Sequence, residues 1–145
     1  MRKRMDVMHD VARTKWNAQR AIRDPERERV LLDEVVQRAQ SHQLDGDFAR
    51  AFFAAQIEAA TLIQEADFQE WRTNKQPPFA DAPSLAELRQ RIDSLNTELL
   101  SALAQARPFL QTNEGQELLR DRVSGVFADY PAAVRDAAVR PLKHP

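Results

Sequence analysis

The most regular pattern in this chain occupies residues 84–103, which read SLAELRQRIDSLNTELLSAL. It opens with a capping box, in which Ser84 and Glu87 satisfy backbone N–H groups at the start of a helix. Apolar residues then recur at spacings of four, three, four and four residues, which places them on one face of that helix. They are Leu88, Ile92, Leu95, Leu99 and Leu103. The stretch predicts a long amphipathic helix that ends at Pro108.

The rest of the chain is helical in character as well. Ala, Leu, Gln, Glu and Arg dominate, and no segment alternates strictly between apolar and polar residues. Asp24 followed by Pro25 predicts an N-cap and the first turn of a helix, and Asp45 or Asp47 predicts another cap. We expect helices over residues 4–22, 25–42, from 45 or 47 to 71, 84–107, 114–129 and 132–140, with a proline-rich loop over 73–83. The predicted fold class is therefore all-α, a helical bundle of about six helices.

Composition excludes several classes of protein. The chain has 145 residues, of which 43% are hydrophobic, so it can bury a sizeable core. Its 3 glycines are too few for a glycine-rich phosphate-binding loop, and the lack of cysteine excludes disulfides, thiolate metal sites and cysteine nucleophiles. The histidines His9, His42 and His144 are too scattered for a metal cluster. A net charge of -1 argues against a polycation that binds nucleic acid.

The sequence also bears on where the protein works. No run of about 18 apolar residues is present, so no membrane-spanning helix is predicted. Residues 1–4 resemble the charged start of a signal peptide, but the mixed residues 5–10 follow in place of an apolar segment. We expect either a cytoplasmic protein or a mature form without its signal peptide.

Charged residues near the start of the chain are candidates for an anion-binding site. Arg4 and Lys15 lie eleven residues apart, about three helical turns, so both fall on nearly one helix face. Asp24, Arg27 and Glu28 lie at the start of the next helix, and a helical hairpin would bring them to the same cleft. The alternative is a helix surface covered with ion pairs.

Two further sets of polar residues border apolar stripes. Gln56, Ala60 and Gln64 are spaced four residues apart. A buried glutamine needs a hydrogen-bond partner, and a polar ligand is one candidate, whereas the alternative is an ordinary residue at the core boundary. Arg89 either extends its charged end to solvent or points into the bundle and binds an anion.

Two parts of the sequence together resemble the all-helical chorismate mutases, and particularly their exported (gamma) subclass. The first comprises VARTKW at residues 11–16, IRDPERE at 22–28 and FFAAQIEAA at 52–60, with Gln64; the second comprises LRQRIDSLN at 88–96 and ELL at 98–100. The ordered set of a lysine, Asp-x-x-Arg-Glu and a glutamine is specific, although each member alone is weak. The resemblance implies one domain over residues 1–145, with core motifs in 4–100 and C-terminal helices over 112–140.

The family rearranges chorismate to prephenate within one molecule, so the resemblance implies an isomerase without cofactor or metal. Lys15 and Gln64 would donate to the ether oxygen of chorismate, because fixed donors favour a transition state in which that oxygen gains negative charge. The remaining residues would bind the substrate. Arg4, Arg27 and Arg89 would bind its two carboxylates. Glu28 would accept a hydrogen bond from its ring hydroxyl, and Asp24 and Ala60 would lie nearby.

The resemblance also implies where the enzyme acts and how it assembles. It implies a periplasmic or secreted enzyme of aromatic amino acid biosynthesis, the shikimate pathway, that forms a homodimer with one site built within each chain and binds neither nucleic acid nor membranes. Ala60 stands where a hydroxyl residue often contacts a substrate carboxylate. Only three residues precede Arg4, so we expect it on a frayed helix end. The alternatives are an isochorismate-pyruvate lyase and a non-catalytic helical module, in which Lys15, Arg27 and Gln64 would be exposed and point apart.

Overall fold

The computed structural model describes residues 1–143 and 145, so His144 lies outside the described residues. The described chain folds into helices without any strand, which confirms the all-α prediction. The elements are α1 (Arg2–Asn17), α2 (Pro25–Ser41), α3 (Gly46–Thr73), α4 (Leu85–Leu110), α5 (Asn113–Val126), α6 (Ala132–Val139) and the 3-10 helix η1 (Arg140–Lys143).

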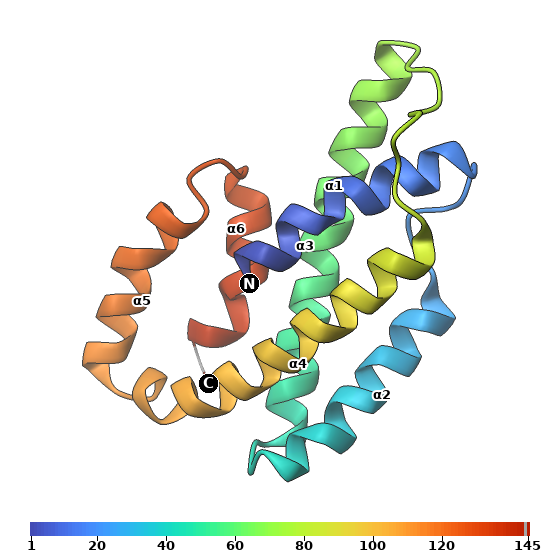
Figure 1. The fold of residues 1–145 in the computed structure, drawn as a ribbon. Coiled ribbons are helices and arrows are strands. Elements are labelled where there is room, and N and C mark those ends of the chain that lie inside the picture. Colours follow the sequence, from blue (N-terminus) through green and yellow to red (C-terminus); the bar gives the residue numbers. More distant parts are fainter. Residues whose placement is uncertain (144) are drawn as a thin grey trace.

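Helix α3 is the centre of the arrangement (Figure 1). Helices α1, α2 and α6 all pack against it, and η1 continues the contact of α6. Helix α4 packs on α1 and on α2, and α5 follows it and packs on both α4 and α6. Helices α1 and α2 therefore lie between α3 and α4, in contact with both.

Two apolar clusters hold these helices together. One joins α1, α3 and α6 through side chains such as Met5, Ile63 and Val139. The other joins α2, α3 and α4 through side chains such as Phe52 and Leu100. Because α3 contributes to both clusters, it carries buried residues along most of its length.

Helix α1 ends at Asn17 rather than at the predicted residue 22. Gln19 adopts the left-handed conformation with a φ of 52°, and the backbone N–H of Arg20 donates to the carbonyl of Lys15 at 2.9 Å. Glycine usually occupies such a position, because a side chain there is strained. The sequence has no glycine at this position, so no residue marks the end of the helix in the sequence.

The prediction that Pro108 ends α4 is wrong, because the helix continues to Leu110. Pro108 has no backbone N–H to donate, but the N–H of Gln111 still donates to the carbonyl of Arg107 at 3.1 Å, so the helix continues past the proline. Helix α5 begins one residue earlier and ends three residues earlier than predicted. Its start is set by Thr112, whose hydroxyl accepts from the backbone N–H of Gly115 at 3.0 Å.

Two absences hold for the part of the chain that the structure describes. None of its helices combines the length and the apolar character that crossing a bilayer requires. Nor do three or more His, Asp or Glu side chains gather there as a metal ion would need.

Candidate active site

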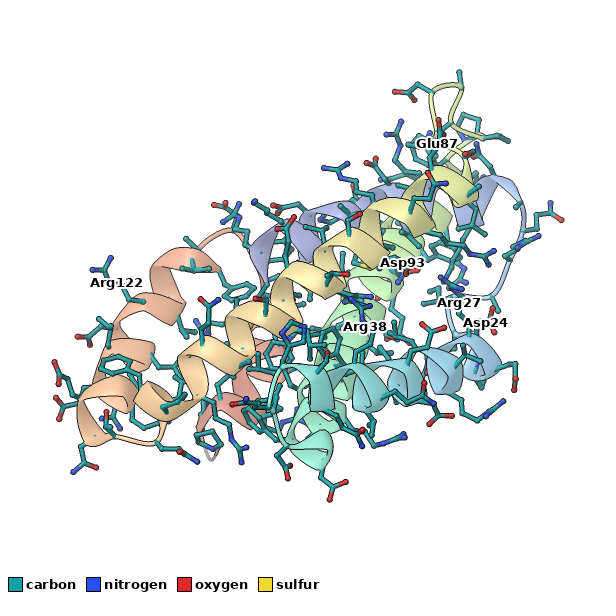
Figure 2. The ribbon with its side chains drawn as sticks, turned by 60° about the horizontal axis from the view of Figure 1, so that its bottom comes forward. Asp24, Arg27, Arg38, Glu87, Asp93 and Arg122 are labelled. Atoms are coloured by element: carbon teal, nitrogen blue, oxygen red, sulfur yellow. The ribbon has the colours of Figure 1, made fainter. Side chains whose placement is uncertain are left out.

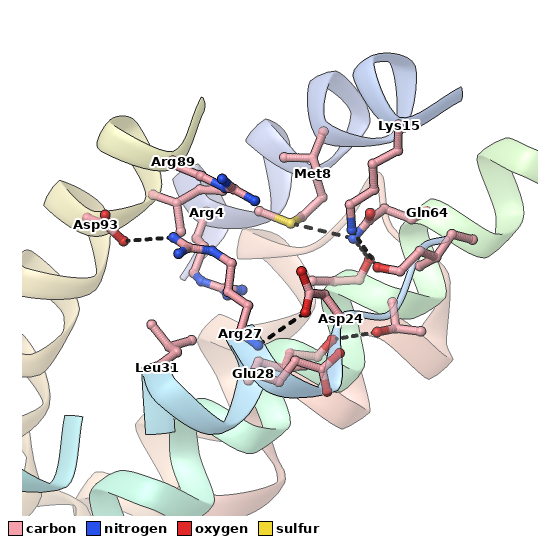
Figure 3. Close-up of a pocket in the computed structure, with 16 residues that line it drawn as sticks. Arg4, Met8, Lys15, Asp24, Arg27, Glu28, Leu31, Gln64, Arg89 and Asp93 are labelled. Carbon is pink, nitrogen blue, oxygen red and sulfur yellow. Dashed lines mark hydrogen bonds and ion pairs between the residues drawn. The ribbon is translucent and has the colours of Figure 1, made fainter. Parts of the chain in front are cut away.

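A cavity of about 140 Å³ lies among α1, the start of α2, α3 and α4 (Figure 3). It has the scale of a small molecule rather than of a polymer. All the residues that the sequence assigned to a site line it: Arg4, Lys15, Asp24, Arg27, Glu28, Ala60, Gln64 and Arg89.

Helical periodicity explains how distant residues reach the same cavity. Arg4, Met8, Val11 and Lys15 follow one another at spacings of four, three and four along α1, so they share one face. The same rule aligns Ile57, Ala60, Thr61 and Gln64 on α3, and Arg89, Ile92 and Asp93 on α4. The expectation that Arg4 and Lys15 share a face therefore agrees with the structure.

Arg4 does not lie on a frayed end, as its position near the start of the chain predicted. Its side chain is only 4% exposed, and its Nε donates to Oδ1 of Asn96 at 3.1 Å while Nη1 donates to the carbonyl of Gln56 at 2.9 Å. Burial lowers the pKa of Arg4 to about 10, so the guanidinium stays charged at neutral pH. The helix start is fixed by Arg2, which donates to Asp129 at 2.6 Å.

The start of α2 places three charged groups at the cavity. Asp24 is the predicted N-cap, and its Oδ1 accepts from the backbone N–H of Arg27 at 3.2 Å. The side chain of Arg27 reaches Asp93 of α4 at 3.8 Å (Figure 2). Arg23 donates to both oxygens of Glu28 at 2.7 and 2.5 Å, and this pairing holds the pKa of Glu28 below its usual range.

Lys15 and Gln64 both line the cavity, and in Figure 3 their side chains extend toward the same part of it. The partly buried Lys15 ammonium donates to the carbonyl of Ile22. Burial lowers the pKa of Lys15, and the carboxylates of Asp24 and Glu28 oppose that shift. Gln64 is buried, and its Nε2 donates to the carbonyl of Ala60 at 3.1 Å.

The cavity has more cations than it can pair internally. Four cationic side chains and three carboxylates line it. Arg4 has no carboxylate partner among the described residues, and Arg89 forms neither an ion pair nor a side-chain hydrogen bond with them. The reading of this region as a surface covered with ion pairs therefore accounts for Arg23 and Arg27 but not for Arg4 or Arg89. Such a site suits an anion with more than one carboxylate.

Sequence reasoning missed the partners that orient the arginines. The leucine pattern placed Leu95 and Leu99 inward, and both do pack, partly buried, against the apolar clusters. The structure buries their neighbours Asn96 and Leu100 more deeply, which the pattern did not predict. The signal was present: Asn96 lies seven residues after Arg89, two helical turns along the same face. Asp93 lies one turn after Arg89 and so also faces the cavity.

Comparisons with known proteins agree with this geometry. The sequence model of the family described as chorismate mutase type II matches residues 1–65. A crystal structure of chorismate mutase from Burkholderia thailandensis aligns with a TM-score of 0.86 and 33% identity, over 99% of this chain and 92% of that one. The chain belongs to the chorismate mutase family.

Other chorismate mutases give the same result. The structure from Burkholderia phymatum has a TM-score of 0.87 at 25% identity, over 98% of this chain and 90% of that one. The secreted chorismate mutases of Mycolicibacterium smegmatis and Mycobacterium tuberculosis are 30% and 34% identical over 75% and 69% of this chain. The matches span 60% and 50% of the length of these two curated relatives.

Proposed function

We propose that this chain is itself a chorismate mutase, which rearranges chorismate to prephenate in the cavity described above. The observation that carries the proposal is the convergence of Lys15, Gln64, Arg4 and Arg89 on one small cavity, where the two guanidiniums have no carboxylate partner among the described residues. Chorismate carries two carboxylates, and arginines bind carboxylates through two parallel hydrogen bonds. The rival reading as a non-catalytic module expects Lys15, Arg27 and Gln64 to be exposed and to point apart. Arg27 is exposed, but Lys15 is partly buried, Gln64 is buried and all three line the same cavity, which favours the enzyme.

Substrate binding lowers the barrier by fixing a conformation. Arg4, Arg27 and Arg89 lie on three different helices, so together they hold both carboxylates at fixed positions. The enolpyruvyl arm is then folded over the ring, in the compact form from which the new C–C bond can form. Holding reacting atoms in this way removes part of the entropic barrier.

Lys15 and Gln64 supply the electrostatic part. As the ether C–O bond breaks and the C–C bond forms, the ether oxygen gains negative charge, and no proton needs to move. An ammonium group has three N–H donors, so Lys15 keeps donors for this oxygen while it is bonded to the carbonyl of Ile22. The Gln64 amide has two N–H donors, one bonded to the carbonyl of Ala60 and the other in a long contact of 4.0 Å with the sulfur of Met8. Sulfur is a weak acceptor, so the ether oxygen of the substrate replaces it. Donors fixed in advance stabilise the transition state more than the ground state.

Three other residues have supporting roles. Glu28 accepts from the ring hydroxyl, and Arg23 keeps its carboxylate ionised and oriented. Asp24 caps α2 and thereby fixes the backbone that carries Arg27. Ala60 offers no hydroxyl, and the neighbouring Thr61 donates its own hydroxyl to the carbonyl of Ile57 at 3.0 Å. The contact of a hydroxyl with a substrate carboxylate is therefore replaced by the arginines.

The product identifies the reaction. We expect purified protein to consume chorismate, measured as loss of its absorbance, and to yield prephenate that acid converts to phenylpyruvate. An isochorismate-pyruvate lyase would leave chorismate unchanged and release salicylate and pyruvate from isochorismate. Consumption of isochorismate alone, or of neither substrate, would refute the proposed function.

We extend the proposal to the setting of the enzyme. It forms a single domain, acts in the periplasm or outside the cell, and assembles as a homodimer in which each site is built within one chain. The names of the secreted relatives support export, and the origin of all four cavity walls in one chain supports the independence of each site. Light scattering of the purified protein at twice the 16.6 kDa chain mass would support the dimer, and the monomer mass would contradict it.

A further inference from the structure

A second cavity, of about 720 Å³, lies beyond the C-terminal end of α1. It is an open cavity lined by the end of α1, the loop at residues 18–23, the C-terminal part of α3 and residues 76 and 78 after it, which lie together at one end of the molecule (Figure 1). Ile22 lines both this cavity and the first one. The loop is therefore a shared wall between two separate spaces.

The lining of this second cavity is cationic on one side. Arg20, Arg23 and Arg72 line it, and its lining residues, all of them within the described chain, include no carboxylate. Arg23 is already bonded to Glu28. The side chains of Arg20 and Arg72 form no hydrogen bond or ion pair with described residues, and the guanidinium of Arg72 lies 5.7 Å from the centre of the Phe68 ring. Two guanidiniums are thus available to an anion.

The other side of the cavity contains aromatic rings, and the side chains of Gln19 and Gln76 also line it. The Trp16 and Phe68 rings meet edge to face, with centroids 5.3 Å apart. The indole N–H of Trp16 donates to the carbonyl of Gln76 at 3.2 Å, and the Asn17 amide is bonded at both ends to the backbone of Phe79. The polar atoms of Trp16 and Asn17 therefore already have partners, and a ligand ring can meet the partly exposed Trp16 and the small exposed part of Phe68, which is 6% exposed.

We propose that this cavity binds a small carboxylate with an aromatic ring, the carboxylate between Arg20 and Arg72 and the ring against Trp16 and Phe68. The ligand carries a net negative charge. A zwitterionic amino acid fits poorly, because its ammonium group would meet guanidiniums and no carboxylate. The site is distinct from the proposed active site, which has acidic as well as basic groups.

Two probes that differ only in the ammonium group test this assignment. We expect isothermal titration of the full chain with 3-phenylpropanoate to show saturable binding of one molecule per chain. L-phenylalanine, which has the same ring and carboxylate, should bind at least about tenfold more weakly, the ratio that about 1.4 kcal/mol produces. No saturable binding of 3-phenylpropanoate, or equal affinity for both probes, would overturn the proposal.

Variants locate the bound molecule. The double substitution Arg20→Gln and Arg72→Gln should weaken 3-phenylpropanoate at least about tenfold, because two charge-assisted contacts are lost. Both side chains are exposed, so an unchanged circular dichroism spectrum is expected. Arg27→Gln, in the first cavity, should change the affinity by less than about twofold. Weaker binding to Arg27→Gln together with unchanged binding to the double variant would place the probe in the proposed active site and overturn this assignment. Because binding is measured without chorismate, neither result depends on mutase activity.

Discussion

Asp24 acts on two neighbours at once. It caps α2 by accepting from the backbone N–H of Arg27, and its charge opposes the lowering of the Lys15 pKa by burial. Asparagine is an equally good N-cap but is neutral. The variant Asp24→Asn therefore separates the two effects, because only the electrostatic one is lost.

The pH profile of this variant is a test of Lys15. The ammonium form is the active one, so kcat/KM should fall as pH rises through the pKa of Lys15, which lies below the ordinary value of 10.5. Asp24→Asn should lower this pKa further and move the alkaline fall to lower pH. Measurement of kcat/KM between about pH 6 and 10 decides the matter. Coincident alkaline limbs would show that Lys15 does not set the profile.

Asn96 positions Arg4 rather than contacting the substrate in this account. Asn96→Ala removes the acceptor at 3.1 Å from a buried Nε, which should cost about 1–3 kcal/mol of stability. The freed guanidinium should bind a carboxylate less well, so KM should rise more than kcat falls. Ser94→Ala, at an exposed position of the same helix, is the control and should change neither constant. If Asn96→Ala lowers stability and leaves KM unchanged, the residue is structural only.

At the scale of the helices, periodicity explains most of what the sequence predicted. Spacing alone placed Arg4 and Lys15 on one face, and the box formed by Ser84 and Glu87 caps α4 as expected. The predictions that failed concern features that residue spacing does not determine. The end of α1 rests on the left-handed Gln19, and the burial of Asn96 follows from the need of Arg4 for an acceptor. Such pairings depend on tertiary contacts between distant segments.

The junction of α4 and α5 depends on Gly115. A Cβ at this buried position would lie 2.0 Å from the carbonyl oxygen of Phe109, closer than any real contact allows. Gly115→Ala should therefore force the helices apart and destabilise the protein by about 1–3 kcal/mol. Gly125→Ala is the matched control in the same helix, because nothing lies within 4 Å of its added Cβ.

The control Gly125→Ala should stabilise the protein rather than destabilise it. Alanine replaces glycine within a helix at a gain of up to about 1 kcal/mol, because less backbone entropy is lost on folding. Urea unfolding of both variants gives the comparison. Equal stability of the two variants would contradict the close approach of α4 and α5.

At the scale of the whole molecule, separate parts of the chain fix the site from outside. The loop after α5 fixes the start of α1 through Asp129 and Arg2, next to the buried Arg4. Helix α6 is bonded to α3 through Gln56, whose amide donates to the carbonyl of Ala138 at 2.7 Å. The sequence predicted these C-terminal helices but no contact between them and the site, because the pairing of helix faces is not encoded in local spacing.

The central claim is that the charge of Lys15 accelerates the rearrangement of chorismate in this cavity. The direct test is kcat/KM for chorismate in the native protein, in Lys15→Ala and in Lys3→Ala, an exposed lysine of the same helix. Removal of one donor to a developing oxyanion typically costs about 10²–10³ in rate, and removal of a cation should cost at least as much. We predict that loss for Lys15→Ala and a change of less than about twofold for Lys3→Ala. A kcat/KM of Lys15→Ala within about threefold of the native value would contradict the account. So would a native protein that does not convert chorismate.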